Sequence, residues 1–455
     1  MVQTRRDQLH AYRFMTRRAM SALVTGEPDS VEPPMRRLTV ITISGIMIAI
    51  VVAAVFAVIG ILKGGGGDAW REEGSVIVEE ETGARFVMID GKLHPAVNYA
   101  SAVLSTGASK LVEVHHVPRS DLDSVQRSTT IGIPGLPDSM PSQEELVRGP
   151  VTVCSQAEAE GVNVSAVVHV QVGGDSSSQP LDPDEALYVE SFDGERFLLF
   201  QGRRHLVSET VEPALQITQD PVKVGSAFLT AIPVGTPFET PSIDQAGSPT
   251  EEAGRSMLVG QVIEVDDGTF RVVLPDGIAT ITDVQAKLLR TAKLDGQRRD
   301  PVPMSLSDVL DMRESDGMDG EMEGLPSAMP SQSSAASTAS GACVVFDEDS
   351  SALRLAVPTD SQAGTPTSES DASKHGSADD VSLSPGVGLI ASTPASNMVY
   401  LIGEPGEAYP AQGIGTLASF GYDGDDAVEI PAELLGVIPH GDALDPARAR
   451  LPLQQ

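Results

Sequence analysis

Residues 38–62 read LTVITISGIMIAIVVAAVFAVIGIL, an uncharged and mostly aliphatic run that separates a short N-terminal segment of the chain from a long C-terminal one. At about 1.5 Å of rise per residue, a helix of this length crosses a hydrocarbon core of about 30 Å with some tilt. The run starts deep in the chain, is longer than a signal-peptide core and has no small-residue cleavage site behind it. We therefore expect a retained membrane anchor; the alternative is a buried helix of a soluble core.

The charge on the two sides of this run indicates its orientation. Of the total formal charge of −33, residues 1–37 contribute +3 and the rest of the chain −36. Since a positively charged flank tends to stay in the cytoplasm, we expect residues 1–37 to be cytosolic and everything after Gly64 to be exported. The acidic exported region should repel nucleic acid, and its charge argues against binding an anionic polymer by electrostatic attraction alone.

The cytosolic segment has the pattern of an amphipathic helix, with Thr4 as a capping residue and Gly26 at its end. Apolar side chains fall near one face and arginines line another. Such a helix docks on a protein or lies on anionic lipid, and both readings stay open. The residues expected to carry docking are Arg5, Arg6, Leu9, Tyr12, Arg13, Phe14, Arg17 and Arg18.

The exported region repeats itself. VEEETGARFVMIDGKLH at 78–94 aligns without a gap on VESFDGERFLLFQGRRH at 189–205. Each copy reads as strand, Gly turn, strand, Gly turn, strand, and a short helix is expected after each, within 95–104 and 208–215. The residues expected to form the repeat core are Val78, Gly83, Phe86 and Gly91 in the first copy and Val189, Gly194, Phe197 and Gly202 in the second.

Two weaker copies follow, at 262–277 with a helix at 281–289, and at 399–406 with a helix at 429–435. Units of this size pair or stack because none buries enough apolar surface alone. A continuous β-solenoid is one arrangement, but the irregular spacing favours several small α+β domains.

The two cysteines lie at matching positions of a second duplication. LPDSMPSQ at 136–143 resembles LPSAMPSQ at 325–332, and Cys154 and Cys343 each follow the leading Leu by 18 positions. In an oxidising compartment this pattern favours a disulfide across a quasi-twofold centre, while free buried thiols are the alternative. A bond that closes so long a loop would contribute up to about 5 kcal/mol.

Catalytic and metal-binding motifs are absent from the sequence. The tetraglycine at 64–67 lacks the Lys and Ser/Thr of a phosphate loop and reads as a flexible tether. No G-x-S-x-G elbow, H-E-x-x-H pair or Cys-x-x-Cys spacing occurs. His94 and His205 recur within the repeat, so a structural role suits them at least as well as a ligand role. No residue is assigned to catalysis, to a cofactor or to a metal.

Several short segments resemble the EccB family, a core membrane component of the actinobacterial type VII (ESX) secretion apparatus. They are TRRDQLHAYRF at 4–14, RAMSALV at 18–24, VPRSDL at 117–122, GIPG at 132–135, IPAELL at 430–435 and LDP at 444–446. The resemblance covers essentially the whole chain, although the acidic linkers look particular to this member.

The resemblance implies an inner-membrane subunit whose N-terminal helix docks beside the motor ATPase EccC and the components EccD and EccE, with self-association in the assembled complex. It also implies that Cys154 and Cys343 form a disulfide in a central periplasmic domain. Four repeat domains similar to a cell-wall-binding lysin subunit would accompany that domain, which implies a cell-wall contact. Members of the family are commonly named ATPases, so ATP is a possible ligand by family attribution only.

The expected function is therefore a structural core subunit that anchors and braces the translocon. The alternatives are an extracytoplasmic ATPase and a membrane-tethered cell-wall-binding module.

The expected fold is a single-pass membrane protein with a cytosolic helix, one transmembrane helix and a large extracytoplasmic α+β region. That region should combine a disulfide-bonded central domain with repeated small ββ(α)-type domains. Linkers are expected at 173–180, 240–256, 311–341 and 358–380, which are rich in Ser, Gly, Pro and acidic residues. The expected boundaries are 1–37 docking segment, 38–62 transmembrane helix, 63–69 tether, 70–110 repeat 1, 111–172 first segment of the central domain, 173–239 repeat 2, 240–256 linker, 257–300 repeat 3, 301–357 second segment of the central domain with an acidic, Ser-rich insertion, 358–380 linker, 381–428 repeat 4, and 429–455 a C-terminal segment returning to the central domain.

Overall fold

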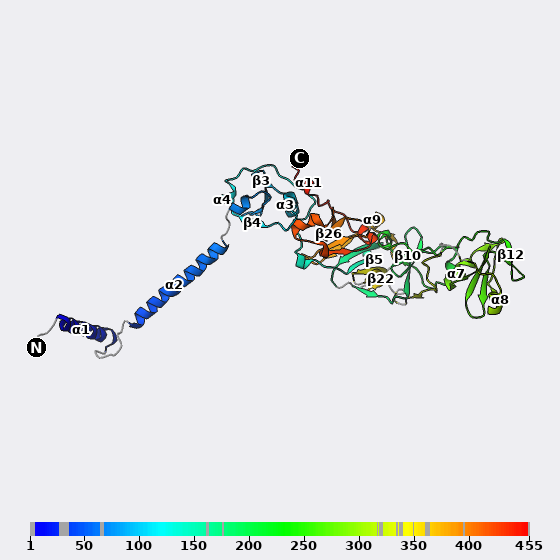
Figure 1. Cartoon of the computed structure of the whole chain (residues 1–455), viewed down its shortest axis with the longest axis horizontal. Helices are drawn as coiled ribbons and strands as arrows, with labels where there is room; N and C mark the ends of the chain where they lie inside the picture. Colours follow the sequence, from blue (N-terminus) through cyan, green and yellow to red (C-terminus); the bar gives the residue numbers. More distant parts are fainter. Residues whose placement is uncertain are drawn as a thin grey trace. The chain divides into compact units, whose positions relative to one another are not determined.

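The computed structural model divides into two compact units, residues 1–72 and residues 73–455 (Figure 1). It describes residues 5–26, 36–63, 68–160, 163–174, 177–315, 317, 322–333, 335, 340–348, 350–359, 365–394 and 396–453. The second unit is called the β body below. The proline pair expected to separate the docking helix from the span, and the tetraglycine tether, lie outside the described residues.

The first unit is helical. Helix α1 (Arg5–Thr25) lies within the expected docking segment 1–37, whose expected cap Thr4 is outside the described residues, and α2 (Arg36–Lys63) contains the whole apolar run. Within α2, residues Thr39–Phe56 have a mean hydropathy of 2.6 and none of these residues is buried. An apolar helix left uncovered by protein suits a lipid environment, so the soluble-core alternative is not supported. A short 3-10 turn, η1 (Asp68–Arg71), follows the tether.

The centre of the β body is a sheet built from two long antiparallel hairpins. Its strands β6, β5, β21 and β22 lie in that order, and three shorter strands extend the edges. On β6, Val168, Val170 and Val172 are buried in the main core while the residues between them are less buried, which is the alternation expected of a sheet with one face covered. The bounds are β5 (Val151–Glu160), β6 (Asn163–Val172), β7 (Ser178–Pro180), β21 (Gly341–Asp347), β22 (Ser350–Pro358), β23 (Ser368–Glu369) and β24 (Asp380–Leu383).

Four smaller sheets in the described residues of the body share one topology. Three consecutive strands form an antiparallel meander, a helical segment follows, and a fourth strand pairs in parallel with the first. We call them β units 1 to 4. Unit 1 consists of β1 (Val76–Glu79), β2 (Arg85–Ile89), β3 (Lys92–Pro95), α3 (Tyr99–Thr106) and β4 (Val114–Val117). Unit 2 consists of β8 (Glu185–Glu190), β9 (Arg196–Phe200), β10 (Arg203–Leu206), α5 (Glu212–Leu215) and β11 (Val222–Lys223).

The weaker sequence copies adopt the same order of elements. Unit 3 consists of β14 (Val262–Val265), β15 (Phe270–Leu274), β16 (Gly277–Ile281), α7 (Asp283–Leu289) and β19 (Val302–Met304). Unit 4 consists of β25 (Leu389–Ser392), β26 (Val399–Gly403), β27 (Glu407–Ala411), η4 (Ile414–Phe420) and β28 (Ala427–Glu429). A helix expected within 429–435 is present as α10 (Ala432–Gly436), after the fourth strand.

Apolar cores join the units in a symmetric way. The largest core combines the central sheet with units 2 and 4. A second core joins unit 1 to unit 4, and a third joins unit 3 to unit 2. Both halves of the body thus contain an outer unit, a long hairpin and an inner unit, and each outer unit packs on the inner unit of the other half.

The structure departs from the expected boundaries at several strands. Residues 114–117 and 302–304, expected in the central domain, are the fourth strands of units 1 and 3 because they pair with β1 and β14. The expected linkers also contain short elements, including the hairpin β12 (Pro249–Glu252) with β13 (Arg255–Leu258), β20 (Ser331–Gln332) and α9 (Asp371–Lys374). Polar contacts help to fix these elements: Glu369 accepts hydrogen bonds from the Ser226 amide at 2.8 Å and its hydroxyl at 3.2 Å.

The C-terminal segment splits between two partners. Residues 430–438 contribute apolar side chains to the main core, which includes the central sheet. Helix α11 (Pro446–Ala449) instead lies beside α3 of unit 1, which Figure 1 shows as a red helix next to a blue one. Arg450 fixes this contact, since its Nε donates to the Ser105 carbonyl at 2.6 Å and its Nη2 to the Thr106 carbonyl at 2.8 Å.

Candidate functional site

The disulfide lies at the centre of the pseudo-symmetric body. Cys154 on β5 and Cys343 on β21 are directly opposite each other and are bonded, with their Cα atoms 4.1 Å apart. A spacing this short is typical of a non-hydrogen-bonded pair of antiparallel strands. Cys343 is fully buried, Cys154 is 8% exposed, and both pack with Val345 and Ala356 on the sheet face away from the main core. The bond joins the two hairpins and so the two halves of the chain.

The repeat residues divide into packing and turn positions. Phe86, Val189 and Phe197 are buried, while Val78 is only half-buried. The four glycines lie in turns and all have positive φ. Gly91 and Gly202 each follow a residue that also has positive φ, as a type I′ hairpin requires. Gly202 additionally approaches the Leu353 backbone, where an added Cβ would come within 2.6 Å of the carbonyl oxygen.

The recurring histidines hold a return segment against each third strand. His94 Nδ1 contacts the Thr129 carbonyl at 3.1 Å, and His205 Nδ1 contacts the Thr236 carbonyl at 2.8 Å. These carbonyls belong to segments that bridge the edges of β3 and β10. His205 also packs edge-on against Phe238, and its burial lowers its pKa. The structural reading of both histidines therefore fits this geometry.

Sequence reasoning missed a buried carboxylate at the end of the first strand of unit 1. Glu79 is 1% exposed, and Arg119 donates to it from Nε at 2.8 Å and Nη2 at 2.7 Å. Burial acts to raise the pKa of Glu79, but the hydrogen bonds from Arg119 and Thr82 outweigh it and the pKa is lowered. The signal was available, because the Val-Glu pair at 78–79 recurs at 189–190.

The equivalent carboxylate of unit 2 has different partners. Glu190 faces Arg196 at 3.3 Å and Lys223 at 3.7 Å, and Arg196 also pairs with Glu212 at 2.6 Å. The two clusters fasten the start of the meander to neighbouring segments. Their charges are mutually satisfied, so they are suited to holding the units together.

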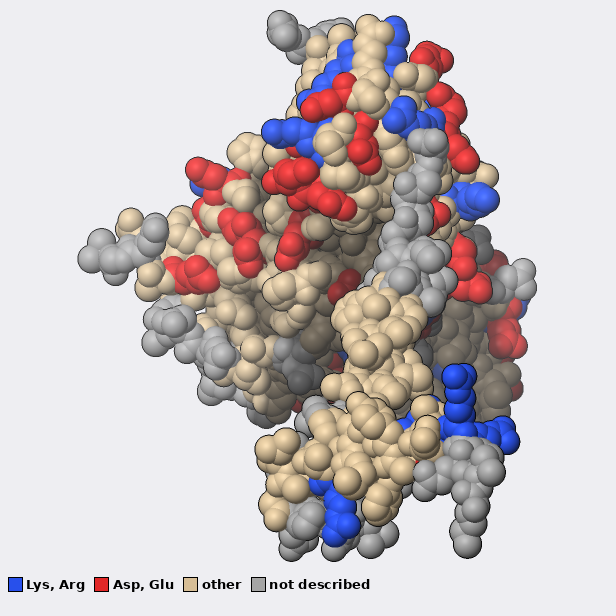
Figure 2. Space-filling view, turned by 90° about the vertical axis from the view of Figure 1, so that its left-hand side faces the viewer, with Lys and Arg blue, Asp and Glu red and all other residues tan. Residues whose placement is uncertain are grey.

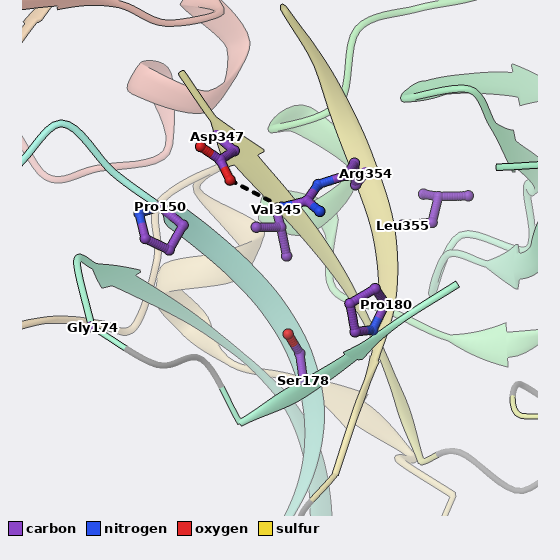
Figure 3. Close-up of a pocket in the computed structure, with 8 residues that line it drawn as sticks. All are labelled: Pro150, Gly174, Ser178, Pro180, Val345, Asp347, Arg354 and Leu355. Atoms are coloured by element: carbon purple, nitrogen blue, oxygen red, sulfur yellow. Dashed lines mark hydrogen bonds and ion pairs between the residues drawn. The ribbon is translucent and has the colours of Figure 1, made fainter. Parts of the chain in front are cut away.

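Two of the cavities on the β body are open to solvent and lined by described residues. The first, of about 200 Å³, opens beside β7, β21 and β22, where Asp347 and Arg354 pair at 3.2 Å. Figure 3 shows this ion pair on one side of the cavity and the Ser178 hydroxyl on another, with Pro150 and Pro180 forming its walls. The second, of about 250 Å³, lies between the LPDSMPSQ segment and unit 4. Neither brings a nucleophile to a base, and no cluster of metal-ligating side chains occurs among the described residues.

The predicted docking residues all lie on α1. Every side chain described on this helix is exposed except Ser21. Tyr12, Phe14 and Leu23 are among the most exposed large apolar residues of the chain, at 73%, 63% and 86%. Arg5, Arg6, Arg13, Arg17 and Arg18 are exposed on the same helix. Charge is distributed differently on the β body, where Figure 2 shows acidic side chains gathered over a region of the face it draws.

One uncovered apolar helix, carried by the same chain as four β units around a disulfide-linked sheet, defines a membrane-anchored protein of modular β architecture. The family described as "Type VII secretion system ESX-1, transport TM domain B" matches residues 1–454, and the chain belongs to it. The resemblance to EccB read from the short segments is thereby confirmed.

Curated relatives and solved structures agree with this membership. The ESX-1 secretion system ATPase EccB1 of Mycobacterium tuberculosis (strain H37Rv) is 27% identical over 305 residues, which are 64% of this chain and 62% of the relative. The ESX-3 secretion system ATPase EccB3 of the same strain is 27% identical over 338 residues, 68% of this chain and 61% of the relative. The match thus spans about three fifths of the length of these relatives.

The fold is shared with chains of solved ESX assemblies. A chain of an intact ESX-5 inner membrane complex superposes with a TM-score of 0.63 at 20% identity, covering 100% of this chain and 96% of that one. A chain of an EccB3 dimer from the ESX-3 core complex gives a TM-score of 0.61 at 22% identity, covering 82% and 99%.

Proposed function

We propose that the chain is a structural subunit of a type VII secretion membrane complex, anchored by α2 and bracing the translocon with its β body. The observation that carries the proposal is the family match over residues 1–454, together with a fold shared with chains of ESX inner membrane assemblies. The geometry suits this role, because interlocked cores and a disulfide make one body from several small units.

The proposed topology is a single pass of the inner membrane, with α1 in the cytoplasm and the β body in the periplasm. Positive charge before the span and acidic charge after it support this orientation. A disulfide in the body also suits an oxidising compartment. The four β units are proposed to be copies of one repeat domain, on the strength of their common strand order.

We assign α1 the role of docking on the other cytosolic and membrane components, of the EccC, EccD and EccE types. The exposed apolar residues Leu9 and Tyr12 support protein docking, whereas Arg13 and Arg17 would favour an anionic lipid surface. Self-association is proposed from the solved EccB3 dimer and from the C3 composite model of the ESX-5 inner membrane complex.

Purification of the membrane complex from two variants tests the docking role. Leu9→Asp with Tyr12→Asp should release the partner components, because a buried apolar contact would gain two charges. His10→Asp with Ala11→Asp, at exposed positions of the same helix outside the expected docking residues, is the matched control and should retain them. Full retention of the partners by the first variant would show that the face with Leu9 and Tyr12 is not their docking site.

A second candidate, ATP hydrolysis, rests on the names of the curated relatives. Neither cavity of the β body presents a glycine-rich loop at a helix start, the usual cradle for phosphates. Hydrolysis by highly purified full-length chain that a substitution within the chain abolishes would establish the activity. Activity that disappears on further purification would remove it.

A further inference from the structure

β unit 3 carries a concentrated basic segment within the acidic body. Residues 287–299 contain five Lys or Arg and one acidic residue, whereas residues 73–455 together carry −36. Arg290, Lys293, Arg298 and Arg299 are all exposed. The whole-chain charge, which argues against anionic partners, therefore does not describe this area of the surface.

The basic residues are presented by a tight hairpin. Strands β17 (Lys293–Leu294) and β18 (Gln297–Arg298) are joined by Asp295 and Gly296, with φ of 52° and 76°, as in a type I′ turn. The register places Lys293 directly opposite Arg298. Like charges at directly opposite positions destabilise a strand pair, so folding alone gives no reason for this arrangement.

Three of the five cations in this segment lack acidic partners among the residues that the structure describes. Lys287 is satisfied by Asp283 at 2.8 Å, and Arg290 lies 4.0 Å from the fully exposed Asp300. Lys293, Arg298 and Arg299 form no ion pair with any described residue. Three neighbouring charges are left for an external partner.

The hairpin is held firmly on unit 3. Leu294 is buried, and the Thr291 hydroxyl at its base lies 2.6 Å from that of Thr240 and donates to the Leu288 carbonyl at 2.6 Å. A fixed base reduces the entropy lost on binding, which favours use of the hairpin as a recognition element.

We propose that this basic hairpin, residues 290–299, docks on an acidic face of a second copy of the chain. The argument is charge complementarity, because two bodies of −36 repel each other unless a basic surface of one meets an acidic surface of the other. Salt screens charges beyond about 8 Å at physiological ionic strength, so the charges at the contact itself decide the outcome. The inference rests on the self-association proposed above and assigns it a surface.

The test compares full-length chains reconstituted in lipid nanodiscs. Lys293→Glu with Arg298→Glu should weaken association at least about tenfold and remove most of its salt dependence. Lys92→Glu with Lys110→Glu changes the net charge equally at exposed lysines of unit 1 and should associate like the parent chain. The mass distribution measured across a concentration and salt series reports both effects.

The outcomes separate this inference from the proposed function. If the parent chain associates and the hairpin variant matches it, the hairpin is not the contact while self-association stands. If the parent chain stays monomeric at every concentration, the proposed self-association and the hairpin contact both fail.

A photo-crosslinking residue at Gln297 in cells identifies the occupant directly. Capture of an acidic segment of a second copy supports the inference. Capture of an anionic wall polymer, or of a different protein, would overturn it.

Discussion

At the scale of single residues, equivalent positions of the β units keep their chemistry while their surroundings differ. His205 is buried and His94 is half-buried, although both contact the carbonyl of a return segment. Glu79 and Glu190 likewise end their strands with different basic partners. Aligning the two copies shows that these residues recur, but not how deeply each side chain is buried, because the neighbouring unit decides the burial.

Burial of His205 predicts a pH-dependent stability. Burial lowers the pKa of His205 in the folded chain from an ordinary value of about 6.5. The contribution of the neutral imidazole to stability is therefore fully present above a pH of about 6.5. As the pH falls below it, the unfolded chain takes up the proton first and stability is lost until the lowered folded pKa is passed. His205→Gln should reduce the loss of thermal midpoint between neutral and mildly acidic pH. His94→Gln is the matched control and should lose as much thermal midpoint at acidic pH as the parent chain. An unchanged pH profile in His205→Gln would contradict this interpretation.

Arg450 predicts a second residue-level effect. Its guanidinium donates hydrogen bonds to two carbonyls at the C-terminal end of α3. A positive charge at this end of a helix also interacts favourably with the helix dipole. Arg450→Ala should lower the free energy of unfolding by about 1 kcal/mol and raise amide exchange at the end of α3. Arg448, which pairs with Asp442 at 3.5 Å on the surface, provides the control, and its Ala variant should change stability less. Equal effects would show that the cap is unimportant.

At the scale of elements, local signals were predictable and long-range pairings were not. The apolar run, the amphipathic helix and the two strong meanders all lie where the sequence places them. The pairing of β4 and β19 with units 1 and 3 was not predicted, because their partners, β1 and β14, lie about 40 residues before them in the chain and the strands are short. The expected linker at 358–380 contains the short elements β23 and α9, which are held by Glu369 and other polar contacts that composition does not reveal.

The disulfide gives a prediction for the pair of long hairpins. Removing it with Cys154→Ala and Cys343→Ala frees a loop of 189 residues in the unfolded chain. Stability should fall by up to about 5 kcal/mol, seen as a lower denaturation midpoint by circular dichroism. Reduced parent chain is the control and should unfold like the double variant. A midpoint equal to that of the oxidised parent would mean that β5 and β21 do not need the bond.

At the scale of the whole molecule, the β body reads as two halves joined across β5 and β21. The sequence predicted a quasi-twofold centre between the cysteines, which pair across β5 and β21. The apolar cores show in addition which units of the two halves pack on each other. The exchange of partners, in which each outer unit packs on the inner unit of the other half, is not encoded by any local motif. It follows only when the two hairpins pair.

The central claim is that this chain is a structural subunit of the type VII secretion membrane complex. Quantitative mass spectrometry of the complex purified through the intact chain from native membranes tests it most directly. The account predicts EccC-, EccD- and EccE-type components in fixed proportion to this chain. Recovery of the chain without those components, under conditions that keep them associated with one another, would contradict it.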